Sequence, residues 1–330
     1  MPAIHHVLAT VDYSPAHREH LRRLFAPADV EFVSASDVAA IDRALERSDV
    51  AVLAGDVSDQ IARAPGLRWI HCDHAGLNAS ARPEIIGRRD LVVTASAGRA
   101  APALAQHAIF FALALTYDAP GLVEMKSRRL WRGLPGYEDR RGLMGKTMTV
   151  VGLGHTGREV VRLAGALGMR VIGYGRGAAQ GQVAGLDEYV DAAAGGRLDE
   201  VLGRSDVVVL CVRLTDETYH LIGEQQLEAM RSTSYLINLA RGSVVDEHAL
   251  VAALRAGTIA GAGLDVFERE PLPADAEIWD APNTIITPHV TAEMPDLVAR
   301  SLAIIERNVD RYRAGEPLEN AMAAGDLYTH

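Results

Sequence analysis

A glycine-rich segment, Val150–Gly157, reads Val-Val-Gly-Leu-Gly-His-Thr-Gly. It follows an apolar stretch that predicts a strand, and we expect a helix from Arg158 to Leu167. In this context Gly152 permits a tight turn, Gly154 lets a pyrophosphate approach the backbone, and Gly157 lets the helix pack closely on the strand. The helix N-terminus adds free N–H groups and a positive dipole end for phosphates. The segment therefore predicts dinucleotide binding through Gly152, Gly154, His155, Thr156 and Gly157.

The next expected strand ends at Tyr174-Gly175-Arg176. A site for NAD normally has an acidic residue about 20 residues past the glycines, where it binds the ribose 2′-hydroxyl. Gly175 stands at this place, so no carboxylate repels a 2′-phosphate, and the guanidinium of Arg176 can pair with one. We therefore expect NADP(H) to be preferred, with NAD(H) possible. The alternative is that Arg176 is a surface residue and the site accepts both dinucleotides.

Three further segments each place a charged residue at or after the end of an expected strand: Ile237–Glu247, Gly263–Pro271 and Thr287–Val290. Singly, each has an ordinary explanation as a loop, a turn or a buried histidine. Together with the glycine turn, and in this order, they resemble the D-isomer-specific 2-hydroxyacid dehydrogenase family, and within it the glyoxylate and hydroxypyruvate reductases. The resemblance is dense from about Gly142 to His289 and looser elsewhere.

The chemistry of this family explains why these residue types occur together. Hydride transfer to a 2-keto acid leaves negative charge on the keto oxygen, where a proton must arrive. His289 is the natural general acid, because imidazole titrates near neutrality. The resemblance implies that Glu270 stabilises the imidazolium, and that Arg241 binds the substrate carboxylate and polarises the carbonyl with its forked guanidinium. It also implies that Asp265 accepts a hydrogen bond from the nicotinamide carboxamide.

The segment Trp69–Asn78 contains two histidines and a cysteine. Successive residues on a strand point to opposite faces and do not easily bind one ion, so we expect no metal and interpret His71 and Cys72 as strand packing. The resemblance instead implies that backbone N–H groups near Ala75 and Gly76 bind the substrate carboxylate together with Arg241, and that His74 helps to select the substrate's tail. The further cofactor contacts that it implies are Ser96, Val212, Ala240 and Asp265.

Three positions depart from the family pattern. Gln106 stands where the family usually has Glu, and Arg213 replaces a usual Pro near the adenosine. Arg213 is either a second contact of the 2′-phosphate or a solvent-exposed side chain. The segment Thr291–Met294 replaces a run of small residues near the substrate, so an unusual substrate remains an alternative.

The elements that must position these residues fall into two alternating blocks of strands and helices, which predict parallel sheets covered by helices. Strands of the first block are expected at His6–Thr10, Asp29–Val33, Val50–Ala54, Trp69–Cys72 and Leu91–Thr94. Strands of the second block are expected at Met148–Val151, Val171–Tyr174, Val207–Val212, Tyr235–Asn238, Ala262–Val266 and Thr284–Thr287.

We therefore expect an α/β protein with two doubly wound parallel-sheet domains, a Rossmann cofactor domain and a flavodoxin-like substrate domain, with a cleft between them. The substrate domain is discontinuous, comprising residues 1–98 and 291–330, and residues 99–290 form the dinucleotide-binding domain. The stretch Ala100–Tyr117 predicts a helix that is apolar on most sides. Such a helix must be buried in a core or against a second subunit. We favour the second, and so expect a homodimer formed through the cofactor domain.

Composition limits the possible partners. The 330 residues carry 33 Lys and Arg against 43 Asp and Glu, a net charge of −10. This charge argues against nucleic acid or an anionic membrane as a partner. Two cysteines, with no secretory signal, fit a reducing cytoplasm. The expected function is NAD(P)H-dependent reduction of a 2-keto acid to a D-2-hydroxy acid. The alternative from another class is a dinucleotide-sensing corepressor that keeps this fold and its catalytic residues.

Overall fold

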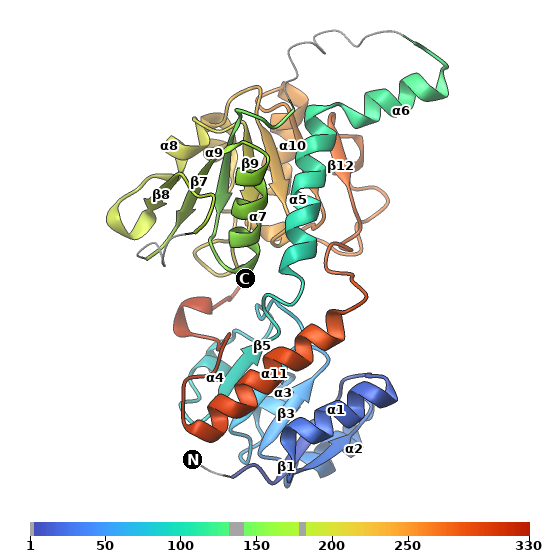
Figure 1. The fold of residues 1–330 in the computed structure, drawn as a ribbon, viewed down its shortest axis with the longest axis vertical. Helices are drawn as coiled ribbons and strands as arrows, with labels where there is room; N and C mark the ends of the chain where they lie inside the picture. The colour runs from blue at the N-terminus through green and yellow to red at the C-terminus, as the bar shows by residue number, and fades with distance from the viewer. Residues whose placement is uncertain (1–2, 132–141, 178–182) are drawn as a thin grey trace. The chain divides into compact units, whose positions relative to one another are not determined.

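The computed structural model describes residues 3–131, 142–177 and 183–330 (Figure 1). It consists of two compact units. The first unit combines Met1–Arg99 with Met294–His330, and the second comprises Ala100–Glu293. Each unit contains one sheet, and every pairing between its strands is parallel. The expectation of two α/β domains with doubly wound parallel sheets is confirmed.

The sheet of the first unit has the order β2-β1-β3-β4-β5, which is the flavodoxin-like order. Its strands are β1 (His6–Ala9), β2 (Asp29–Phe32), β3 (Val50–Leu53), β4 (Trp69–Cys72) and β5 (Val92–Ala95). Its helices are α1 (Pro15–Phe25), α2 (Val38–Leu45), α3 (Asp59–Ala62), α4 (Pro83–Ile86) and α11 (Leu297–Ala314).

Successive strand residues of this sheet enter two separate cores, because side chains alternate between the faces. Leu8 joins Ile41 of α2 in one core, whereas Val7 joins Phe25 of α1 and Leu302 of α11 in the other. The C-terminal helix α11 thus completes the core of the N-terminal sheet.

The sheet of the second unit has the order β12-β11-β10-β9-β6-β7-β8, which is the Rossmann order with one added strand. Its strands are β6 (Thr147–Val151), β7 (Arg170–Gly175), β8 (Glu188–Asp191), β9 (Val207–Leu210), β10 (Tyr235–Asn238), β11 (Gly261–Leu264) and β12 (Thr284–Ile286). Its helices are α5 (Ala101–Thr116), α6 (Ala119–Ser127), α7 (His155–Ala166), α8 (Leu198–Leu202), α9 (Glu224–Ala229) and α10 (Glu247–Ala256). The chain proceeds in opposite directions from β6, so the carboxyl ends of β6 and β9 mark the switch point where such sheets bind ligands.

Two details of this unit differ from the sequence-based expectations. Helix α7 begins at His155, not at Arg158, so Gly154 is its N-cap and the glycine turn forms the first helical turn itself. Strand β8 was not expected, because all four of its residues are only half-buried and form no apolar run at the edge of the sheet.

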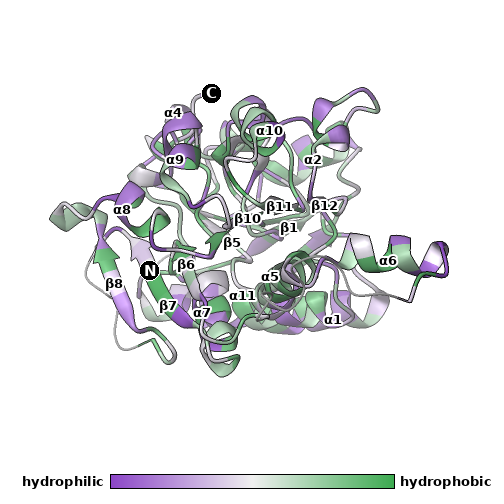
Figure 2. Cartoon of the chain, turned by 90° about the horizontal axis from the view of Figure 1, so that it is seen from above, coloured by the Kyte–Doolittle hydropathy of each residue, from purple (hydrophilic) through white to green (hydrophobic). Residues whose placement is uncertain are grey.

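Helix α5 is rich in apolar residues, and the hydrophobic colour prevails along it in Figure 2. Ala105, Ala108 and Phe111 are fully buried in the core of its own unit, where α5 packs on α7. Of its large side chains, Phe110 is half exposed. The core therefore accounts for most of the apolar character that we had assigned to a second subunit. Among the described residues, no single helix has the length and apolarity to cross a membrane; α5 and α6, bent by 60°, meet these criteria only as a pair.

Candidate active site

The glycine turn follows β6 at the switch point of the second sheet. Gly152 has φ 96, a left-handed conformation that favours glycine. A Cβ on Gly157 would overlap the carbonyl oxygen of Gly152. Only glycine therefore lets the helix lie this close to the turn. At Gly154, by contrast, a Cβ would meet no atom within 4 Å. The surface over Gly154 is therefore open, while Gly157 is closed by packing.

These features fit the phosphates of a dinucleotide. Helix α7 has 12 residues, and no side chain caps its N-terminus. Its first N–H groups and its positive dipole end lie beside the open face of Gly154, where a pyrophosphate requires them. Val212 lies two residues after the end of the neighbouring strand β9.

Arg176 follows β7 as predicted, but it has a partner that the sequence did not indicate. It forms an ion pair with Glu217 in the loop after β9, and both side chains are more than half exposed. Gly175 pairs in register with Asp191 of β8, whose carboxylate accepts a hydrogen bond from the Gly177 N–H at 3.1 Å. A 2′-phosphate on Arg176 would have to compete with Glu217.

His289 and Glu270 are in direct contact. Nδ1 of His289 lies 2.6 Å from Oε2 of Glu270, and the other carboxylate oxygen accepts the backbone N–H of Phe267 at 2.9 Å. Both side chains are partly exposed. His289 has φ 53, which is uncommon for a residue with a Cβ. With Nδ1 on the carboxylate, Nε2 remains to exchange a proton with a ligand.

The loop that carries His289 is folded around a buried carboxylate. Asp265 is fully buried; its Oδ1 accepts the Thr287 hydroxyl at 2.5 Å and the Val290 N–H at 3.1 Å. Its Oδ2 accepts the Thr291 hydroxyl at 2.6 Å and the Thr291 N–H at 3.3 Å. Asp265 therefore binds the chain's own loop, a role that the sequence reasoning missed. The departure from the family at Thr291 supplies two of these hydrogen bonds.

His107 of α5 extends this network, since its Nε2 lies 3.2 Å from the Thr287 hydroxyl. Burial lowers the pKa of His107, and the negative charge of Asp265 opposes the shift only in part. A neutral imidazole at this position suits contact with a hydroxyl group.

Arg241 follows β10, whose neighbour β11 precedes Asp265 in the same sheet. The amide of Asn238 fixes the turn before it, accepting the Ala240 N–H and donating to the Arg241 carbonyl, each at 3.0 Å. Gly242 packs so closely on the backbone of Phe267 that no Cβ would fit. The segments of Arg241 and Glu270 are thus in contact at the carboxyl edge of the sheet.

The predicted substrate loop lies in the first unit, after β4. Ser96, after β5, donates its N–H to the carbonyls of Cys72 and His74 at 3.1 and 3.0 Å, and its hydroxyl to Asp73 at 3.0 Å. Asp73 also pairs with Arg99 at 2.7 Å. Ser96 and Asp73 therefore anchor the start of the segment His74-Ala75-Gly76, and Asp73 is a residue that the sequence reasoning did not single out.

His71 and Cys72 lie buried within β4. The His71 ring contacts the hydroxyl groups of Thr94 and Ser96, each at 2.9 Å. Burial lowers the pKa of His71 to about 4 and raises that of Cys72 to about 12, so both groups are neutral near pH 7. These are the properties of packed strand residues.

The comparison with known families gives one match over more than half of the chain. Residues 111–291 match the model of the D-isomer specific 2-hydroxyacid dehydrogenase, NAD binding domain. The chain belongs to this family. The matched range contains the glycine turn, Arg241, Asp265, Glu270 and His289.

Several of the similar proteins are named glyoxylate reductase. A glyoxylate reductase from Korarchaeum cryptofilum is 40% identical over 173 residues, which are 52% of this chain and 50% of that protein. One from Thermofilum pendens is 34% identical over 260 residues, 77% of this chain and 74% of that protein. The match thus spans about half the length of the first of these relatives and three quarters of the second.

Solved structures of the family cover nearly the whole chain. A D-isomer specific 2-hydroxyacid dehydrogenase from Xanthobacter autotrophicus Py2, in complex with NADPH and MES, has a TM-score of 0.80 at 28% identity and covers 98% of this chain and 99% of its own. An NADPH-dependent glyoxylate/hydroxypyruvate reductase from Sinorhizobium meliloti, in complex with NADP and sulfate, has a TM-score of 0.80 at 26% identity, covering 98% and 100%.

Proposed function

We propose that this protein reduces a 2-keto acid to the D-2-hydroxy acid, with NADPH as the preferred hydride donor. The observation that carries the proposal is the 2.6 Å contact between His289 and Glu270, at the carboxyl edge of a sheet that also presents Arg241 and the glycine turn. The names of similar reductases support the same reaction class.

Each residue of this edge has a chemical task. The Arg241 guanidinium binds the substrate carboxylate through paired hydrogen bonds and polarises the keto group. His289 donates the proton from Nε2 to the keto oxygen as negative charge develops there. Glu270 accepts the Nδ1–H, fixes the tautomer and stabilises the imidazolium before the proton leaves. In the reverse direction the same imidazole accepts the hydroxyl proton.

The dinucleotide, when bound, supplies the hydride. The backbone of Gly152, Gly154 and Gly157, with His155 and Thr156 in the first turn of α7, would hold its phosphates. Val212, Ala240 and Ser96 would line the rest of its site. Asp265 would accept a hydrogen bond from the nicotinamide carboxamide only after one of its hydrogen bonds to the loop of His289 breaks. We therefore propose that its main role is to position this loop.

We propose that the first unit is the substrate domain. The N–H groups of Ala75 and Gly76 would bind the substrate carboxylate, and His74 would select its tail. Nε2 of His74 is buried without a hydrogen-bond partner, and Asp56 lies 3.8 Å away. An imidazole beside a carboxylate suits a substrate with a polar tail, such as hydroxypyruvate.

The preference for NADPH rests on Arg176 and on the absence of a carboxylate at Gly175. Glu217 limits this preference, because it holds the same guanidinium in the free protein. The complexes of similar proteins with NADPH and NADP are in keeping with it.

We also propose that the protein is a homodimer. Several large apolar side chains of the second unit are exposed: Phe110 of α5, Leu122 and Val123 of α6, and Met144 each expose from 40% to 75% of their surface. Exposed apolar groups of this kind mark protein interfaces. A dimer in light scattering that becomes a monomer in Val123→Asp supports this surface, and a monomeric wild-type protein contradicts it.

The proposed function is tested by following reduced-nicotinamide absorbance with glyoxylate, hydroxypyruvate, pyruvate and phenylpyruvate, each with NADPH and NADH. We expect rapid oxidation of NADPH with at least one acid, and severe loss of both binding and turnover of that acid in Arg241→Ala. NADPH binding without turnover across the panel contradicts the proposal for these acids and favours an unusual substrate or the dinucleotide sensor.

A further inference from the structure

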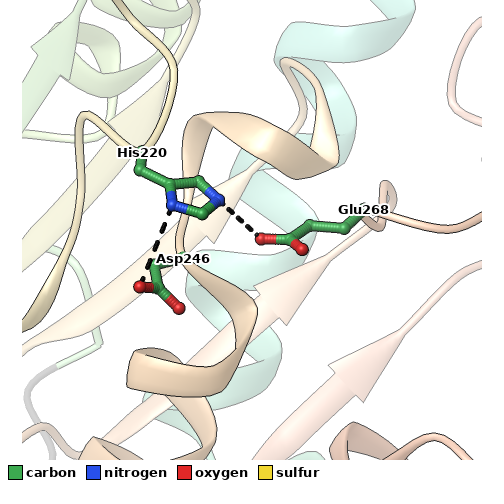
Figure 3. A group of neighbouring side chains, drawn as sticks. All are labelled: His220, Asp246 and Glu268. Atoms are coloured by element: carbon green, nitrogen blue, oxygen red, sulfur yellow. Dashed lines mark hydrogen bonds and ion pairs between the residues drawn. The ribbon is translucent and has the colours of Figure 1, made fainter. Parts of the chain in front are cut away.

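His220 connects three loops of the second unit. It lies between β9 and α9, and its ring stands between two carboxylates (Figure 3). Nε2 is 2.9 Å from Oε1 of Glu268, and Nδ1 is 3.9 Å from Oδ2 of Asp246. The His220 N–H donates to the Ser243 carbonyl at 2.8 Å. Its φ of 47 lies in the left-handed region, so the backbone is held in a conformation that favours Gly or Asn.

The contacts of His220 lie next to two residues of the proposed active site. Ser243 and Asp246 follow Arg241 in the chain, and Glu268 precedes Glu270 by two residues. The segments after Arg241 and before Glu270 also touch each other at Gly242, which has no room for a Cβ. His220 is therefore bonded to both segments at the point where they meet.

The hydrogen bonds of Glu268 also restrain the position of Glu270. Its Oε1 also accepts the Glu247 N–H at 3.2 Å, and its own N–H donates to the Glu247 carboxylate at 3.3 Å. The adjacent N–H, that of Phe267, donates to Oε1 of Glu270. The other oxygen of Glu270 contacts His289. A fixed backbone at Phe267 and Glu268 thus fixes the direction of the Glu270 carboxylate.

Within the described ranges, His220 is the one basic side chain found within 4 Å of the carboxylates of Glu268 and Asp246. Glu247 adds a third carboxyl group, whose pKa is raised by burial and by the charge of Glu268. Removal of the imidazole would leave like charges facing one another, held only by backbone N–H groups. The loop before Glu270 would then lose the contact that opposes this repulsion.

The same three side chains have ligand atoms within 4.8 Å of one another and could approach a metal ion. The ring geometry favours a bridge without metal, in which Nε2 forms a hydrogen bond with Glu268 and Nδ1 faces Asp246 at the longer distance of 3.9 Å. Each ring nitrogen faces a different carboxylate, whereas an ion takes one nitrogen and requires the oxygens on that side (Figure 3). Nε2 is moreover within hydrogen-bonding distance of Glu268 already.

We propose that His220 is a positioning residue, which acts through Glu268 to hold the Glu270 carboxylate on His289. This inference rests on the proposed function for its catalytic consequence. Its structural part, that the imidazole restrains the loop Val266–Pro271, stands on the contacts alone. The two parts can be tested separately.

Two variants separate the effect of the imidazole ring from that of the left-handed backbone conformation. His220→Gly keeps the left-handed conformation and removes the ring, and His220→Asn keeps both the conformation and an N–H donor. The control is Glu277→Gln, which removes a charge from the exposed Arg255–Glu277 pair of the same unit. If His220→Gly does not fold, Glu268→Gln takes its place, because it keeps the size of the side chain and removes its charge.

We expect His220→Gly to lower kcat about 10-fold, since small misplacements of a catalytic group cost up to about 100-fold. The Kd of NADPH should be unchanged, because the glycine turn is not part of this contact network. His220→Asn should recover most of kcat, and the control should match the wild type. In a Glu270→Gln background, His220→Gly should lower kcat little further, because both changes act on the contact between Glu270 and His289.

Hydrogen exchange of the peptide that spans Val266–Pro271 gives a readout without substrate. It should be faster in His220→Gly than in the wild type and the control. If this peptide exchanges in His220→Gly at the wild-type rate, the inference is overturned, whatever the kcat of the variant. Wild-type kcat, or full additivity with Glu270→Gln, overturns its catalytic part. Failure of the wild type itself to turn over contradicts the proposed function and leaves the exchange result to decide on the restraint.

The same proteins test the metal alternative. Zinc content and activity are measured before and after treatment with EDTA. Loss of wild-type kcat with EDTA, recovery with Zn²⁺, and no recovery in His220→Gly would show a metal site in place of the positioning bridge. No effect of EDTA on kcat, together with little bound zinc, supports the bridge.

Discussion

The glycine turn offers a pair of matched substitutions with opposite expected effects. A methyl group at Gly157 would overlap the Gly152 carbonyl oxygen and lie 3.0 Å from its carbon and 3.3 Å from a methyl of Val150. These contacts are backbone atoms and a fully buried side chain, which cannot move aside without shifting α7 on the sheet. At Gly154 the same methyl group would meet nothing within 4 Å, and the backbone has φ −72, which alanine adopts freely.

Gly157→Ala should therefore lower the free energy of unfolding by about 1–3 kcal/mol, the cost of overpacking a filled site. For a domain of this size, about 2 kcal/mol corresponds to a fall in Tm of about 4–8 °C. Gly154→Ala should change stability by less than about 0.5 kcal/mol. It should nevertheless raise the Kd of NADPH about 10-fold or more, because the methyl group occupies the surface that the pyrophosphate must approach.

Urea unfolding without dinucleotide measures the first effect, and titration with NADPH followed by fluorescence measures the second. NADPH binding by Gly154→Ala as tight as that of the wild type would contradict a phosphate site over Gly154. Wild-type stability of Gly157→Ala would contradict the close packing of Gly157 on Gly152, which leaves no room for that methyl group.

Three further predictions follow from single sites. Gly175→Asp should shift the ratio of kcat/KM values toward NADH, because a carboxylate there binds a 2′-hydroxyl and repels a 2′-phosphate; an unchanged ratio contradicts our interpretation of that position. Glu217→Gln should raise the preference for NADPH, since it frees Arg176 from its partner; a lower preference would show that Glu217 aids the site. Burial lowers the pKa of His71 to about 4, below its ordinary value of about 6.5. The unfolded chain therefore takes up this proton first, and stability should fall by as much as about 3 kcal/mol between pH 6.5 and pH 4. His71→Gln should flatten that part of a urea-unfolding series, and an unchanged slope contradicts the assignment.

The sequence predicts the sheets well, because their strands are short apolar runs bounded by turns. It did not predict β8, whose half-buried residues leave no periodic signal. The start of α7 was placed three residues late, because His155, Thr156 and Gly157 lack apolar character and only the packing of Gly157 on Gly152 reveals that the helix has begun.

Residue types at the site were predictable, but the partners that hold them were not. His289 and Glu270 are separated by 18 residues in the chain, and only the adjacency of β11 and β12 brings their loops together. Asp265 carried a clear signal as a polar residue after a strand, yet its bonds to Thr287 and Thr291 depend on how the loop folds back. The pair of Arg176 with Glu217 joins the ends of strands that are not neighbours, so no local pattern indicates it.

We propose that His289 transfers the proton during reduction of a 2-keto acid. The most direct test is a single turnover, in which protein loaded with NADPH is mixed with hydroxypyruvate and the loss of reduced-nicotinamide absorbance is followed in the wild type and in His289→Ala. We predict that both proteins bind NADPH equally, and that the variant is slower by about 100-fold or more, the usual contribution of a general acid. Equal rates in the two proteins would contradict the claim.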